Sequence, residues 1–77
     1  MSNYNFDKSV DVGKFTVEID SKAAYGYFEH HELGDDCGGG LWFTKNELTD
    51  YDGVFELPAS VTCGIRELGF IVPEEME

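Results

Sequence analysis

Residues 14–20, KFTVEID, decide the fold class, because apolar and polar side chains alternate at every step. Phe15, Val17 and Ile19 share one side of an extended chain, while the residues between them share the other side. This period of two predicts a β-strand with one face on a core and one face in water. Residues 20–22 (DSK) have the polar composition of a turn.

Further strands are predicted on both sides of this one. Residues 24–30 are rich in aromatic side chains and predict a second strand, whose buried face the sequence leaves open. Residues 41–45 (LWFTK) predict a third strand. Residues 46–53 are polar and predict a turn, with a short fourth strand at residues 54–55. Residues 1–12 are expected to be a loose N-terminal arm or an edge strand.

The clearest helix signal spans residues 57–69. Pro58 suits the first helical position, and Gly69 suits a left-handed stop at the end. Gly64 lowers the helix propensity and therefore indicates a close contact between helix and sheet. Apolar residues recur at spacings of four, four and three, which places them on one stripe: Leu57, Val61, Ile65 and Leu68.

Residues 70–72 (FIV) predict a final short strand before Pro73 and an acidic tail. The fold class is therefore α+β: an antiparallel β-sheet of three to five strands with one C-terminal α-helix packed across it. A chain of 77 residues has no room for a second core, so residues 1–77 are expected to form a single domain.

The charge is the strongest compositional signal. Sixteen acids against five bases give a formal net charge of -11, whereas small soluble domains usually do well with a magnitude of roughly 2 to 8. This balance argues against direct binding to nucleic acid, whose phosphates require Lys and Arg, and against acidic membrane surfaces. A basic protein is the natural partner.

The start MSNYNF lacks a basic segment followed by an apolar one, and no apolar run approaches the roughly 18 residues of a membrane span. We therefore expect a cytoplasmic protein in a host cell, with Cys37 and Cys63 reduced. Pairing of the two thiols in a disulfide is the less favoured alternative. Cys63, inside the predicted helix, is expected to be a small, partly buried residue.

Residues 30–43, HHELGDDCGGGLWF, contain several possible metal ligands, but no CxxC, HxH or HExxH spacing is present. Adjacent His30 and His31 in a strand point to opposite faces. Cys37 follows two acids, which disfavour a reactive thiolate. We therefore expect no metal, no cofactor and no enzymatic activity.

The glycines of this stretch, residues 38–40, lead into a strand and not into a helix N-terminus, so they do not form a phosphate cradle. We interpret them as a wide hairpin turn with left-handed glycines. Residues 50–53 (DYDG) match a calcium loop only in part, and a polar turn is the preferred interpretation.

Acidic residues cluster in the two predicted loops, and a tryptophan lies nearby. Loops held by a rigid scaffold often carry binding residues, and tryptophan is enriched at interface hot spots. Trp42 is equally compatible with a core position. The candidate partner-binding residues are Glu29, Glu32, Asp35, Asp36, Trp42, Asp50 and Asp52.

The runs GYFEHHELGDDCGGGLWF (residues 26–43) and LTDYDGVFELPASVTCGIRELGFIV (residues 48–72) resemble small acidic proteins of phages and mobile elements. In size and charge, the chain is similar to small anti-CRISPR proteins. This resemblance is one of class and implies no catalytic motif. It implies an inhibitor that mimics nucleic acid on a CRISPR effector complex.

Two hypotheses of function follow. In the first, an acidic surface occupies the basic groove of a partner that handles nucleic acid, and its affinity falls steeply with salt. In the second, the chain is a small interaction module, either monomeric or a homodimer through a strand edge. Exposed aromatic residues such as Tyr25, Tyr27 and Trp42 then form the contact.

Overall fold

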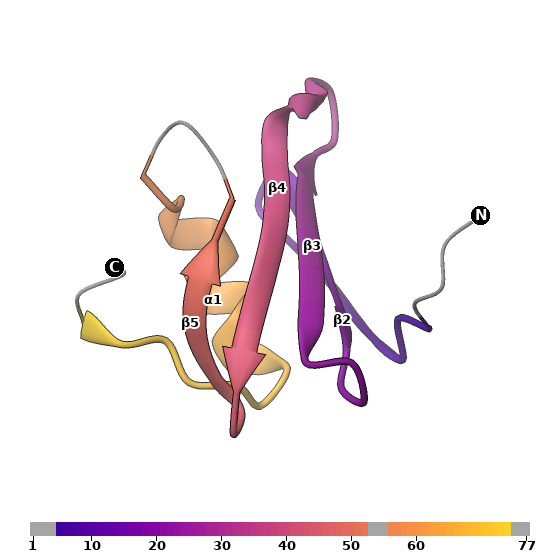
Figure 1. The fold of residues 1–77 in the computed structure, drawn as a ribbon. Coiled ribbons are helices and arrows are strands. Elements are labelled where there is room, and N and C mark those ends of the chain that lie inside the picture. The colour runs from indigo at the N-terminus through magenta and orange to yellow at the C-terminus, as the bar shows by residue number, and fades with distance from the viewer. Residues whose placement is uncertain (1–4, 53–55, 75–77) are drawn as a thin grey trace.

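The computed structural model describes residues 5–52 and 56–74. Five strands pair antiparallel in chain order to form one sheet, and a helix follows them (Figure 1). This is the predicted α+β fold, with the sheet at the upper end of the predicted range. The elements are β1 (Lys8–Val12), β2 (Phe15–Asp20), β3 (Tyr25–His30), β4 (Gly34–Thr44), β5 (Glu47–Tyr51) and α1 (Ala59–Glu67).

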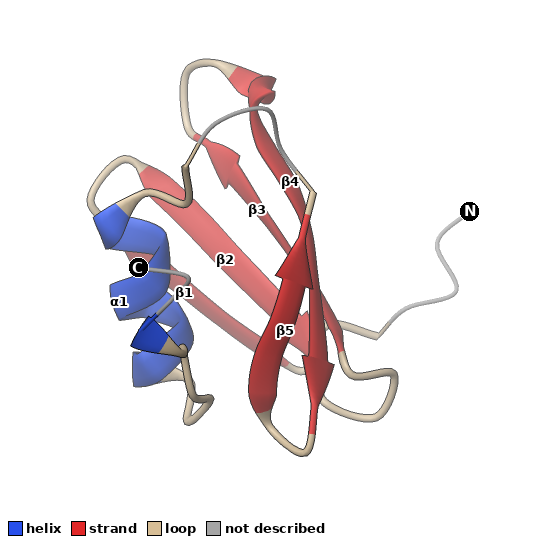
Figure 2. Ribbon diagram, turned by 60° about the vertical axis from the view of Figure 1, so that its left-hand side comes forward, coloured by secondary structure: helices blue, strands red, loops and turns tan. Residues whose placement is uncertain are grey.

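The helix α1 lies on one face of the sheet, over β1 and β2, so the molecule has two layers (Figure 2). The core between the layers includes fully buried residues from both: Val17, Ile19, Phe28, Leu41, Leu48, Val61 and Ile65. No helix of the described residues is long and apolar enough to cross a membrane.

Strand pairing determines the buried face of β3, which the sequence had left open. Val17 on β2 lies opposite Phe28, and Ile19 lies opposite Gly26. Because directly paired residues share a face, Phe28 and Gly26 point toward the core with the alternating apolar residues of β2. Tyr25 and Tyr27 consequently point to the other side of the sheet.

The predicted close contact of Gly64 is confirmed. A Cβ atom built on Gly64 would lie 2.8 Å from Cγ2 of Val12 and 3.2 Å from Cγ2 of Val17. The glycine therefore allows α1 to approach β1 and β2 closely. Of the two alternatives for residues 1–12, the structure shows an edge strand at residues 8–12, because β1 is the outermost strand on that side.

The helix begins and ends close to the predicted residues. Gly69 has the expected left-handed φ of 94°. Pro58 precedes the first helical residue and is not part of the helix, because its ψ of 145° is extended; its carbonyl oxygen accepts the N–H groups of Val61 and Thr62. Cys63 is exposed, which corrects the prediction of partial burial. It lies about 200° around the helix from Val61, so it points away from the sheet.

The prediction of a turn across residues 46–53 is wrong, because β5 occupies most of this range. The reversal takes only two residues, Lys45 and Asn46, which have φ values of 52° and 68°. Two left-handed residues are typical of a tight hairpin turn that matches the twist of its strands. Leu48 then reaches the core and is fully buried. The predicted third strand at 41–45 is the end of β4 together with Lys45 of this turn.

Residues after α1 return to the edge of β5. The N–H of Leu48 donates to the carbonyl oxygen of Ile71, and the N–H of Ile71 donates to that of Asn46, each over 2.8 Å. Phe70 and Val72 are buried on either side of this contact. The predicted strand at 70–72 is thus reduced to one parallel bridge. The strand predicted at residues 54–55 lies outside the described residues.

Candidate functional site

The side of the sheet opposite α1 is crossed by no helix or strand of the described residues (Figure 2). Strand alternation and the pairing registers determine which residues it carries. We call this side the open face. Its positions are Ser9, Asp11, Thr16, Glu18, Asp20, Tyr25, Tyr27, Glu29, Gly40, Trp42, Thr44, Glu47 and Asp50, of which Asp20 is buried.

An aromatic pair lies on the open face, where β3 begins and β4 approaches its end. Tyr25 and Trp42 are opposite each other on β3 and β4, with ring centroids 5.5 Å apart and an interplanar angle of 64°. A Cβ atom built on Gly40 would lie 3.0 Å from Cη2 of Trp42 and 3.0 Å from Oη of Tyr25. Both rings therefore extend over Gly40. The side chain of Trp42 is at the surface, with 41% of the residue exposed, which excludes a core position.

Carboxylates also stand on the open face. Glu18 lies opposite Tyr27, and Asp50 lies opposite Trp42. The acids at open-face positions that are not buried are Asp11, Glu18, Glu29, Glu47 and Asp50. None of the five basic residues occupies an open-face position. Three are in turns and one is on α1, while the fifth is at an inward position of β1: Lys14, Lys22, Lys45, Arg66 and Lys8.

The hairpin between β3 and β4 differs from the prediction. The chain reverses over residues 31–33, followed by Gly34 with a φ of 56°. Nδ1 of His30 accepts the N–H groups of Glu32 and Leu33, each over 3.1 Å, and this stabilises the turn.

The glycines at 38–40 belong to β4 and none has a positive φ, so the wide glycine turn is wrong. Gly39 is needed for close packing instead, because a Cβ there would collide with the carbonyl oxygen of Asp52.

The candidate residues are divided among several places. Glu29, Trp42 and Asp50 share the open face. Glu32 is exposed in the turn, and Asp52 is exposed just after β5. Asp35 and Asp36 lie on β4. The idea of two acidic loops is therefore wrong, because most of these acids lie on strands.

Sequence reasoning missed several open-face residues. Asp11, Glu18 and Glu47 were not among the candidates, although each alternates with an inward-facing apolar neighbour. For Glu18 the signal was present in the alternation of residues 14–20. The alternation that identifies the residues of the core also identifies the residues of the opposite face. Acids on that face are therefore candidate partner-binding residues, as are acids in loops.

Three carboxylates near the ends of the strands accept short hydrogen bonds. The hydroxyl of Thr16 donates to Asp11 over 2.6 Å and lowers the pKa of Asp11, and His31 at 3.4 Å acts in the same direction. The hydroxyl and the N–H of Ser21 lower the pKa of Asp7.

Asp20 is buried. Its carboxylate accepts the N–H groups of Asn5, Ala23 and Lys22, which together lower its pKa despite desolvation. These bonds attach the N-terminal segment to the turn between β2 and β3.

Other sites in the described residues offer less chemistry. No three His, Cys, Asp or Glu side chains there come close enough together to hold a metal ion. Cys37 and Cys63 are both free thiols.

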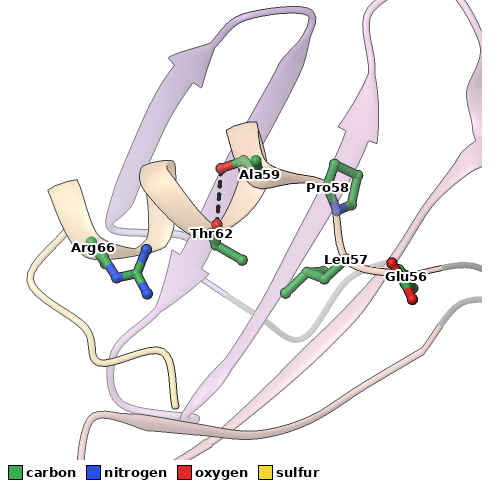
Figure 3. A pocket seen from close by; sticks show the side chains of 6 residues that line it. All are labelled: Glu56, Leu57, Pro58, Ala59, Thr62 and Arg66. Atoms are coloured by element: carbon green, nitrogen blue, oxygen red, sulfur yellow. Dashed lines mark hydrogen bonds between the residues drawn. The ribbon is translucent and has the colours of Figure 1, made fainter. Parts of the chain in front are cut away.

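A hollow beside the first turn of α1 is lined by Glu56, Leu57, Pro58, Ala59, Thr62 and Arg66 (Figure 3). The hydroxyl of Thr62 already donates to the carbonyl oxygen of Ala59 over 2.9 Å. The open face is therefore the stronger candidate. No known family model, curated protein or solved structure matches the chain.

Proposed function

We propose that the protein uses its open face to bind a basic surface of a partner protein that handles nucleic acid, and that it inhibits this partner by excluding the nucleic acid. The observation that carries the proposal is the charge of this face. Carboxylates stand at open-face positions on β1, β2, β3 and β5, and no base accompanies them there. A uniformly negative surface attracts a positive one and orients it during association.

The charge spacing supports mimicry of a duplex. Five strands have four gaps of about 4.8 Å, so the sheet spans about 19 Å across its strands. Duplex DNA carries about 11 charges over that length, and about half of them face one side. The open face presents a comparable number of carboxylates: Asp11, Glu18, Glu29, Glu47 and Asp50. The molecule measures 33 × 30 × 21 Å, which is a suitable size for a groove built for nucleic acid.

The most specific form of this proposal is an anti-CRISPR protein. A CRISPR effector holds its guide–target heteroduplex in a positively charged channel and recognises it through backbone geometry. A small, rigid surface with spaced carboxylates fits such a channel. The resemblance in size and charge to small anti-CRISPR proteins supports this form.

The proposal is tested by comparing two variants with the same charge. Glu18→Gln, Glu29→Gln and Asp50→Asn together neutralise the open face. Glu56→Gln, Glu67→Gln and Glu74→Gln neutralise three exposed acids on α1 and the segments next to it. Each triple variant changes the net charge from -11 to -8.

Each protein is used to capture partners from bacterial lysate at about 50 mM and about 500 mM salt, which changes the screening length several-fold. We expect the wild type and the helix-side variant to capture the same nucleic-acid-binding protein at low salt and to release it at high salt. The open-face variant captures much less, and excess duplex DNA or RNA displaces the wild type from its partner. Equal capture by both variants, or capture unaffected by salt and by duplex, would contradict the proposal.

A second candidate function is a homodimer formed through the edge of β1. Among the described residues, β1 pairs only with β2, so its outer edge has backbone groups open to another strand. The opposite edge of the sheet is partly covered by the bridge between Glu47 and Ile71. Two measurements test this candidate. A homodimer requires the mass of a dimer in sedimentation equilibrium, and it also requires slow hydrogen exchange at the backbone amides of Ser9 and Asp11.

A further inference from the structure

The arrangement around Trp42 points to the kind of side chain that the open face recognises. Trp42 and Asp50 are paired with each other on β4 and β5. Both residues are exposed. Oδ1 of Asp50 accepts the N–H of Tyr51 over 2.9 Å, and this bond restricts the rotation of the carboxylate.

The indole of Trp42 is packed against neighbouring residues before any partner binds. Tyr25 packs against it edge to face, and Gly40 has no side chain to lift the two rings away from the sheet. A rigid aromatic side chain loses little conformational entropy on binding. A partner side chain therefore meets an indole and a carboxylate at paired positions of neighbouring strands.

We propose that this pair binds an arginine side chain of the partner. A guanidinium is planar, so it can stack on the indole while its N–H groups donate to the carboxylate. A lysine ammonium is a strongly hydrated point charge that cannot do both with the same geometry. This inference rests on the proposed function, because it specifies how the open face recognises a basic surface.

The test compares labelled nona-arginine with labelled nona-lysine, using fluorescence anisotropy at about 50 mM salt. Trp42 is the only tryptophan of the chain, so its own emission reports contact in the wild type. We expect nona-arginine to bind about two- to five-fold more tightly for each indole contact, and to change the emission of Trp42 more than nona-lysine does. Trp42→Leu keeps an apolar side chain without a π face and should remove this preference while nona-lysine affinity changes little.

Two controls accompany the variant. Ile71→Ala shortens another exposed apolar side chain, far from Trp42 in the sequence, and should preserve the preference for arginine. Thermal unfolding verifies that Trp42→Leu is folded.

Each outcome has a separate meaning. Equal affinity of the wild type for the two peptides overturns the arginine inference and leaves the proposed function standing. A preference that survives Trp42→Leu also overturns the inference, because the arginine then binds elsewhere. If neither peptide binds the wild type, both the inference and the proposed function fail.

Discussion

Asp50 lies opposite Trp42 only because β5 contains an extra residue. Phe43 pairs with Leu48 and Trp42 pairs with Asp50, so Thr49 has no partner of its own on β4. The hydroxyl of Thr49 donates to the carbonyl oxygen of Trp42 over 3.2 Å. Without this bulge, regular alternation from the buried Leu48 would turn Asp50 toward the core. β-bulges often re-aim side chains in this way next to functional sites.

Replacing Gly64 by alanine should destabilise the protein. The added Cβ would lie 2.8 Å from Cγ2 of Val12, so α1 must move away from the sheet. Overpacking of this kind costs about 1–3 kcal/mol, against a gain of about 1 kcal/mol in helix propensity. We therefore expect a net loss of about 1 kcal/mol in the free energy of unfolding, measured by urea denaturation. The exposed Cys63→Ala on the same helix is the control and should lose nothing; a Gly64→Ala protein as stable as wild type would contradict the close contact.

Gly39→Ala should have a larger effect. Its Cβ would collide with the backbone carbonyl of Asp52, which cannot rotate away as a side chain can. We expect the free energy of unfolding to fall by about 3 kcal/mol, which is the upper end of the range for overpacking. Gly34→Asn is the matched control, because Gly34 has a left-handed φ that asparagine tolerates and has nothing within 4 Å of its added Cβ. If both variants unfold at the same urea concentration, the carbonyl group of Asp52 does not pack closely against Gly39 of β4.

Asp20→Asn should reduce stability in a pH-dependent manner. Hydrogen bonds from Asn5, Ala23 and Lys22 lower the pKa of Asp20 below 3.8 in the folded protein. The unfolded chain therefore binds a proton more readily, so the contribution of the carboxylate is present above about pH 4 and is lost as the pH falls through the lowered pKa.

The measurement is the urea midpoint of wild type and variant at neutral pH and at about pH 3. The exposed Asp52→Asn makes the same change in charge and serves as the reference. The urea midpoint of Asp20→Asn should lie far below that of Asp52→Asn at neutral pH, and the two midpoints should lie close together at about pH 3. If the difference between the two urea midpoints is the same at both pH values, the ionised carboxylate of Asp20 does not attach the N-terminal segment.

The sequence predicted those elements whose periodicity is complete. In residues 14–20 every second side chain is apolar, so both faces of β2 follow from the pattern. The helix follows equally well, because Val61 and Ile65 repeat at the helical period and both are fully buried. The face of β3 did not follow, since aromatic residues occupy both of its faces and only its register with β2 selects one.

The remaining errors have a common physical origin in interactions distant along the chain. β5 was missed because its one fully buried residue, Leu48, is followed by a bulge that breaks the alternation. The glycines at 38–40 suggested a turn. In the structure, Gly39 instead makes room for the carbonyl group of Asp52, and Gly40 makes room for the rings of Tyr25 and Trp42. The open face could be foreseen only in part, because its composition depends on which strands are neighbours.

The most direct test of the central claim is an NMR map of the open face. Nona-arginine is titrated into isotopically labelled protein at about 50 mM salt, and the change in each backbone amide shift and in the Trp42 indole N–H is recorded. We predict that the largest changes occur at Trp42, Asp50, Tyr27, Glu18 and Glu29, and that exposed residues of α1 such as Cys63 and Glu67 change little. Changes centred on α1, or spread evenly over all exposed acids, would contradict the assignment of the open face as the binding surface.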